Sequence, residues 1–169
     1  MIPTNQPAPL FTLPSLDSRL YRLEEGRGRF IILNFWSAEC PWSERGDQEL
    51  LTLLPGWGPK VALWTIASNA NESSELINQT AAQRSLPLVL IDSNQQAANL
   101  YGAQTTPHFF VIDPYGILRY QGALDDRTFR QRTATRFYLR DAINTLLAGA
   151  SPDPAQTTPY GCTIVRHVE

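Results

Sequence analysis

"RFIILNFWSAECPWSERGDQELLTLLPG" (residues 29–56) carries the clearest structural signal in this chain. Its opening part, residues 29–36, is an almost unbroken run of β-branched and aromatic residues, which is typical of a strand buried on both faces of a sheet. Cys40 follows, and Pro41 then fits the first turn of a helix whose leucine-rich body ends at the Pro-Gly pair at 55–56. The segment therefore predicts a strand, a turn that carries a cysteine, and a helix.

The rest of the chain continues this alternation of strands and helices. The predicted elements are a small hairpin within 8–25, strands over 60–68 and 86–92, helices after Asn71, over 94–102 and over 135–147, and an antiparallel hairpin over 108–122. This order predicts a three-layer α/β/α domain with a mixed central sheet and an N-terminal hairpin extension. We expect that domain to span residues 1–149, followed by a proline-rich tail at 150–169 that carries Cys162.

Composition excludes several classes of function. With 169 residues, 43% hydrophobic and 18% charged, the chain is large enough to bury a core, so disorder throughout is excluded. A net charge of −2 offers no basic face, so neither nucleic acid nor a membrane surface is expected as a partner. Two cysteines and two histidines do not form a metal motif, and no metal or cofactor is predicted.

Location is predicted from the absence of targeting signals within the chain. The N-terminus shows no signal peptide, and the longest apolar run, residues 30–36, is too short to cross a bilayer. A cytoplasmic protein is expected, although a leader or anchor outside this sequence would leave no trace in it.

Two motifs carry a resemblance to a known family. Residues 34–43, NFWSAECPWS, resemble the NFWASWCGPC type of active-site segment of thioredoxin-like reductases. Residues 104–122, QTTPHFFVIDPYGILRYQG, resemble the segment around the active-site proline of those proteins. The chain is similar to bacterial redoxins of the alkyl hydroperoxide reductase/thiol-specific antioxidant superfamily, and the resemblance covers roughly residues 8–164. It implies a thioredoxin-like fold and thiol–disulfide exchange, with an antioxidant role in cell redox homeostasis.

Cys40 is the predicted nucleophile. The thiolate is the reactive form of cysteine, and a helix N-terminus stabilises a thiolate by up to about 2 kcal/mol. The helix start at Pro41 to Ser43 should therefore lower the pKa of Cys40, whereas the neighbouring carboxylate of Glu39 should raise it. We expect the helix terminus to prevail; the alternative is that Cys40 is an inert buried residue.

The usual partner thiol is missing from the motif. Ser43 stands where a CxxC motif has its second cysteine, and Ser37 stands where another variant has one. The Ser43 hydroxyl is expected to bind the thiolate, but it cannot form a disulfide. Three routes stay open: resolution by Cys162 from the tail, resolution by an external thiol, or a redox-inactive binding module. An extended segment between Gly149 and Cys162 can span about 40 Å, so reach does not exclude the first route.

A peroxide reductase is an alternative to thiol–disulfide exchange. Ser37 matches the hydroxyl position of a peroxiredoxin-type site, but Leu33 stands where that site has a proline. Arg45 and Arg119 are the candidates for the arginine that stabilises the thiolate.

Substrate contacts are predicted around the proline motif. The resemblance implies that Pro107 is cis and lies beside Cys40, so that the backbone of Thr106 pairs with an extended substrate. Trp36 and Trp42 flank the cysteine and either shape a substrate groove or pack in the core. With Ser43, Thr106 and Pro107 they are the predicted substrate-binding residues. The expected partners are a protein or low-molecular-weight thiol or disulfide and an external reductant.

Overall fold

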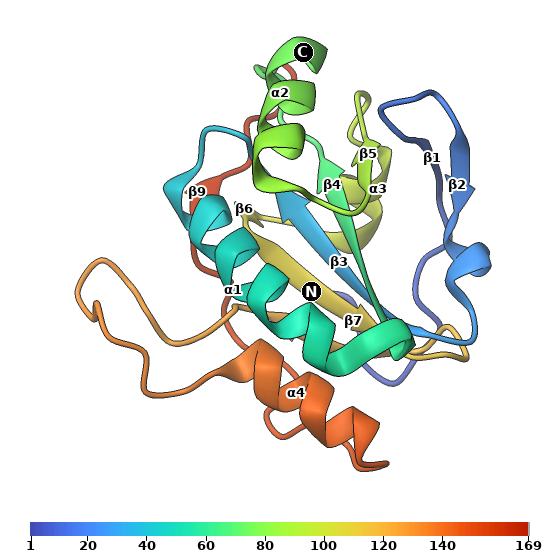
Figure 1. Cartoon of the computed structure of the whole chain (residues 1–169), viewed down its shortest axis with the longest axis vertical. Helices are drawn as coiled ribbons and strands as arrows, with labels where there is room; N and C mark the ends of the chain where they lie inside the picture. Colours follow the sequence, from blue (N-terminus) through green and yellow to red (C-terminus); the bar gives the residue numbers. More distant parts are fainter. Residues whose placement is uncertain (169) are drawn as a thin grey trace.

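The computed structural model describes residues 1–168, which form three layers around a mixed sheet (Figure 1). Its five strands lie in the order β5-β4-β3-β7-β8. They are β3 (Phe30–Trp36), β4 (Val61–Ala67), β5 (Val89–Ile91), β7 (His108–Ile112) and β8 (Leu118–Gly122). Strands β3, β4 and β5 run parallel, whereas β7 is antiparallel to β3 and to β8. The predicted sandwich with a mixed central sheet is confirmed.

Helices and two small strand pairs complete the architecture. The helices are α1 (Pro41–Trp57), α2 (Ser74–Arg84), α3 (Gln96–Tyr101) and α4 (Tyr138–Leu147), with short 3-10 turns at Leu23–Gly26 and Gly58–Lys60. The strand pairs are β1 (Thr12–Pro14) with β2 (Leu20–Arg22), and β6 (Thr105–Thr106) with β9 (Cys162–Thr163), both antiparallel. The first pair is the predicted N-terminal hairpin.

Strand β3 lies at the centre of the sheet and contributes side chains to a hydrophobic core on each of its two faces. Its side chains alternate between faces, so Ile32 packs with Leu50 of α1 and Leu139 of α4, while Leu33 packs with Tyr101 of α3 on the opposite face. These side chains are fully buried, and burying one such aliphatic side chain stabilises the fold by about 1.5–3 kcal/mol. The position of the C-terminal end of β3, where Cys40 follows, is therefore fixed from both sides.

Helix α1 is longer than the sequence predicts. It was expected to end before Pro55, yet it continues through this proline to Trp57. The Trp57 indole N–H donates to Asn144 of α4 at 2.8 Å, and the ring packs against the core between the two helices. This tertiary contact holds the last turn although Pro55 cannot donate a backbone hydrogen bond.

Two other helices begin later than predicted because polar side chains bind the preceding residues. Helix α2 begins at Ser74, and the Ser73 side chain caps it by accepting from the Leu76 N–H. Helix α4 begins at Tyr138 rather than Thr135. Asp126 binds both the backbone N–H and the hydroxyl of Thr135, which keeps that residue outside the helix.

The C-terminal tail lies along the domain. Thr157 donates its backbone N–H to the Gln121 carbonyl at 3.0 Å, and its hydroxyl accepts from the Ala123 N–H at 2.9 Å. Gly122 makes this approach possible, because a Cβ at that position would lie 2.2 Å from the Thr157 hydroxyl oxygen. The tail then reaches β6, where β9 adds its short strand.

Replacing Gly122 by alanine should therefore destabilise the protein. Gly122 has φ of 139°, which disfavours any other residue, and the added methyl group would clash with Thr157. We expect Gly122→Ala to lower the free energy of unfolding by about 2 kcal/mol or more, measured by urea denaturation. Gly56→Ala is the matched control, because its Cβ would meet open space within α1. An unchanged stability in Gly122→Ala would show that the tail does not pack there.

Candidate active site

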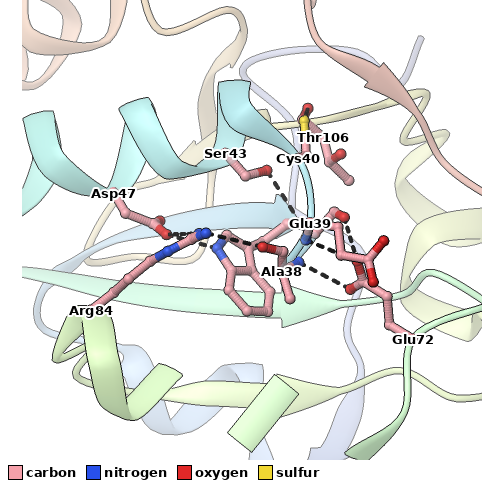
Figure 2. Close-up of polar contacts among 10 residues, drawn as sticks. Ala38, Glu39, Cys40, Ser43, Asp47, Glu72, Arg84 and Thr106 are labelled. Atoms are coloured by element: carbon pink, nitrogen blue, oxygen red, sulfur yellow. Dashed lines mark hydrogen bonds and ion pairs between the residues drawn. The ribbon is translucent and has the colours of Figure 1, made fainter. Parts of the chain in front are cut away.

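Cys40 lies at the junction between β3 and α1, as the sequence predicts. It is the N-cap residue of α1, with Pro41 in the first turn, and only 3% of its surface is exposed. Its thiol donates to the carbonyl of Thr106 at 3.0 Å, across 66 residues of sequence (Figure 2). The Thr106–Pro107 peptide bond is cis, also as predicted. The cysteine and the proline loop are thus brought together.

Cys162 reaches the same place from the C-terminal tail. Strand β9 pairs antiparallel with β6, and the register sets Cys162 opposite Thr106. Both cysteines are reduced thiols, and Cys162 is the more exposed of the two. The Thr106 backbone therefore contacts one cysteine through its carbonyl and pairs with the strand that carries the other.

The two thiols have opposite pKa shifts. Burial by itself raises the pKa of Cys40, but interactions with the Cys162 thiol, the Ser43 backbone N–H and the Thr106 side chain favour the thiolate and bring this pKa below the usual value for a cysteine. The Thr106 hydroxyl is buried and has no other partner within residues 1–168. Burial, followed by interaction with Cys40, raises the pKa of Cys162 to about 12. Cys40 is therefore the thiol that ionises first.

Ser43 supports Cys40 in a different way from the one predicted. Its hydroxyl was expected to bind the thiolate, but the side chain is fully buried and accepts from the backbone N–H of Ser37 at 3.2 Å. The Ser43 backbone N–H, one of the free donors of the helix terminus, faces Cys40 instead. Because it is fully buried, the Ser43 side chain is not available to contact a substrate.

Glu72 holds the loop between β3 and α1, a role that the sequence did not reveal. Its carboxylate accepts from the backbone N–H groups of Ala38 and Glu39 at 3.0 and 3.2 Å, and from the Ser37 hydroxyl at 2.5 Å (Figure 2). Glu72 precedes α2, so its side chain links that helix to the residues just before Cys40. In the sequence, Glu72 is one of several acidic residues, and no local pattern indicates which backbone groups its carboxylate binds.

A buried polar cluster lies beneath α1 and was also missed. Asp47 accepts from the Trp36 indole N–H at 2.8 Å and from the Arg84 guanidinium at 2.9 Å (Figure 2). Arg84 donates in addition to the Ala38 carbonyl at 3.0 Å. Burial raises the pKa of Asp47 to about 6, although these hydrogen bonds oppose the shift. Trp36 is fully buried here. It therefore packs in the core and does not line a substrate groove.

Trp42 lies at the surface of the site. Its ring contacts Tyr160 of the tail edge to face, with 4.9 Å between the ring centroids, and the Arg45 guanidinium lies 5.3 Å from its ring centroid. Of the two tryptophans beside the cysteine, Trp42 is the one available to an incoming molecule.

The residues considered for a peroxide site are engaged elsewhere. Arg45 donates both terminal nitrogens to Asp125, at 2.7 and 3.1 Å, and Arg119 contacts Asp113 and Ser151. Leu33, at the position of the peroxiredoxin proline, is a core residue. Neither guanidinium is directed to Cys40, so the arrangement does not reproduce that type of site.

Within residues 1–168, His, Cys, Asp and Glu side chains do not gather into a group of three or more that could hold a metal ion. No helix in the described part of the chain is long and apolar enough to span a bilayer.

A cysteine that opens the helix after the central strand, facing a cis-proline, is the arrangement of a thioredoxin-like protein, and comparisons with solved structures agree. The thioredoxin domain of a thiol-disulfide oxidoreductase from Bacteroides vulgatus has the same fold, with a TM-score of 0.64, 17% identity, and coverage of 72% of this chain and 89% of that one. Within this class the chain belongs to the AhpC/TSA family, whose model matches residues 4–121.

The chain is also similar to individual proteins. It is 33% identical over 110 residues to thiol-disulfide oxidoreductase ResA of Geobacillus thermodenitrificans (strain NG80-2), covering 64% of this chain and 63% of that protein. The match thus spans less than two thirds of the relative. A solved structure of an uncharacterized conserved protein from Geobacillus kaustophilus has a TM-score of 0.91 at 27% identity, covering 100% of this chain and 95% of that one. The likeness to that structure includes the C-terminal tail.

Titration should show that the two cysteines have different pKa values. We expect a thiolate to form below the usual pKa of cysteine in the native protein and in Cys162→Ser, but not in Cys40→Ser, where burial still holds the pKa of Cys162 above the usual value. Cys162→Ala should raise the pKa of Cys40 relative to Cys162→Ser, because serine still donates a hydrogen bond. Thiolate absorbance in the far ultraviolet measures both. A low-pH step that survives in Cys40→Ser would contradict the assignment.

Asp47 should make stability fall as pH rises. Its pKa is higher in the folded protein than the usual aspartate value of 3.8, so between about pH 4 and pH 6 the folded state binds more protons and loses stability on ionisation. Relative to the native protein, Asp47→Asn should therefore gain about 2 kcal/mol in free energy of unfolding between pH 4 and pH 7. Urea denaturation across this range measures the difference, and Asp141→Asn is an exposed control. A difference that does not change with pH would contradict the shifted pKa.

Proposed function

We propose that this protein is a thiol–disulfide oxidoreductase in which Cys40 is the nucleophile and Cys162 is the resolving thiol. The observation that carries the proposal is the convergence of both cysteines on Thr106, one through its carbonyl and the other through strand pairing. The opposite directions of the two pKa shifts support different roles, because the thiolate is the nucleophilic form and Cys40 is the thiol that ionises more readily. The name of the ResA relative agrees with this class of reaction.

The first step is attack by the Cys40 thiolate on one sulfur of a substrate disulfide. The substrate S–S bond breaks, a mixed disulfide forms at Cys40, and the departing thiolate takes a proton from solvent. The backbone N–H of Ser43 and the Thr106 hydroxyl stabilise the thiolate before the attack.

The second step is attack by Cys162 on the Cys40 sulfur of the mixed disulfide. The bond to the substrate breaks, the second substrate thiol leaves, and a Cys40–Cys162 disulfide forms, so the substrate gains two electrons and the cysteine pair loses two. The Cys40 charge and hydrogen bond contribute to the high pKa of Cys162. Both are absent once Cys40 is in a disulfide, so Cys162 becomes more acidic when it has to react. Two molecules of an external thiol then reduce the Cys40–Cys162 disulfide by two further exchanges, restore both thiols and leave as one disulfide.

We place substrate contacts on Trp42, with Pro107 as the group that positions Thr106. Thr106 and Pro107 are buried beside β9 and would contact a substrate only where β9 leaves β6. The cytoplasm, where disulfides are kept reduced, is the compartment in which this cycle would run.

The proposal predicts a distinct product for each cysteine variant. With a small disulfide as oxidant, the native protein should form the Cys40–Cys162 disulfide, Cys162→Ser should stop at a mixed disulfide on Cys40, and Cys40→Ser should not react. Mass spectrometry of intact protein and of its peptides identifies all three. Glutathione with its reductase supplies the external thiol in a turnover assay, in which Cys40→Ser should be inactive.

Two outcomes would favour the other functions considered. If no adduct forms on Cys40, the chain is a binding module that retains the fold. If hydrogen peroxide oxidises Cys40 much faster than it oxidises free cysteine while disulfides react slowly, the protein is a peroxide reductase.

A further inference from the structure

The C-terminal segment 160–166 follows the edge of the active site, and we call it the C-terminal strap. Its centre, β9, pairs with β6 at two positions, Thr163 with Thr105 and Cys162 with Thr106. This is the backbone edge on which the sequence predicts that an extended substrate should pair. In the reduced protein this edge is therefore occupied by the chain itself.

Contact between the strap and Thr106 is unusually close. A Cβ at Gly161 would lie 2.1 Å from the Thr106 carbonyl oxygen and 3.1 Å from the Pro107 ring. Real Cβ atoms do not approach so closely, so only glycine fits at this position. The residue that precedes Cys162 thus allows the strap to lie directly against the proline loop.

Anchors hold the strap on both sides of Cys162. On the N-terminal side, the Tyr160 ring packs against Trp42, and its hydroxyl accepts from the Phe129 N–H at 2.7 Å. On the C-terminal side, Ile164 is 3% exposed in the core and donates its N–H to the Gln104 carbonyl at 3.1 Å. These contacts fix the strap on the domain at both ends.

The strap is held by a further set of polar contacts beyond Ile164. Val165 donates its N–H to Asn69 at 2.9 Å and accepts at its carbonyl from the Ala70 N–H and the Gln95 side chain. Arg166 binds the Ala103 carbonyl and donates to Asn99 at 2.9 Å. Displacing the strap requires breaking these hydrogen bonds and exposing the buried Ile164 side chain to solvent.

We propose that the C-terminal strap makes the site selective for low-molecular-weight disulfides over extended polypeptides. This inference rests on the proposed function of Cys40. A polypeptide that pairs with Thr105 and Thr106 must displace both strap residues from β6, whereas a small disulfide needs only a local shift of the Cys162 side chain to reach the Cys40 sulfur. The strap also delivers Cys162 as the intramolecular thiol that completes the exchange.

The test compares a small and an extended substrate that carry the same reacting bond. The probes are hydroxyethyl disulfide and a neutral unstructured peptide whose cysteine forms a mixed disulfide with 2-mercaptoethanol. Neutral probes are chosen because Glu39 and Glu44 are exposed near Cys40 and would bias charged ones. The rate of adduct formation on Cys40 is measured in Cys162→Ser, which keeps the strap but removes resolution, and each rate is divided by that of glutathione with the same probe.

In this background the small disulfide should react with Cys40 and the peptide should react at least tenfold more slowly after normalisation. Adding Gly161→Ala, which forces the strap away from Thr106, should raise the peptide rate by about tenfold relative to the small-disulfide rate, because any change in the acidity of Cys40 affects both rates alike. Ile164→Ala removes an anchor remote from the sulfur and should act in the same direction. Val165→Ala is the matched control, because this side chain is 39% exposed and its bonds are made by the backbone. Circular dichroism verifies that each variant is folded.

The possible failures are distinguishable. If Cys40 reacts with neither probe, the proposed function is wrong. If it reacts with both probes at equal normalised rates, or if Gly161→Ala and Ile164→Ala leave the peptide rate unchanged, the exchange reaction stands and the strap does not select the substrate.

Discussion

The contact between the Cys40 sulfur and the Thr106 carbonyl is the constraint around which the site is arranged. It joins the end of the central strand to the proline loop, across 66 residues of sequence. Each partner is fixed by its own element, because Cys40 caps α1 and Thr106 precedes β7 in the same sheet. The tight packing of β3 between two cores therefore sets the geometry of the cysteine.

A buried thiol would ordinarily be neutral, and three donors around Cys40 reverse that tendency. The helix supplies the Ser43 N–H, the proline loop supplies the Thr106 hydroxyl, and the tail supplies Cys162. They come from three separate parts of the chain. The acidity of Cys40 is therefore a property of the assembled fold, and it depends on the redox state of Cys162.

Stability and site geometry are linked through the carboxylates of Asp47, which is buried, and Glu72, which is half-buried. Asp47 lies 1% exposed with a raised pKa, which opposes folding near neutral pH, yet it holds Arg84 against the carbonyl of Ala38 just before Cys40. Glu72 holds the same loop from the opposite side through two backbone N–H groups. The loop is thus bound by side chains of two elements rather than by its own backbone pattern. Such buried polar contacts are sensitive to loss of either partner.

The sequence by itself determined the strand, turn and helix around Cys40, the hairpin of β7 and β8, and the mixed sheet, because hydrophobic periodicity and turn residues are local signals. The position of Cys40 at a helix N-terminus and the importance of Pro107 followed from the same local patterns and the resemblance. Only the tertiary structure decided that Trp36 is a core residue, that the Ser43 hydroxyl faces Ser37, and that Cys162 lies opposite Thr106. Pairing of distant segments depends on packing between elements far apart in the chain, and no local pattern encodes which strand edge a proline-rich tail will cover.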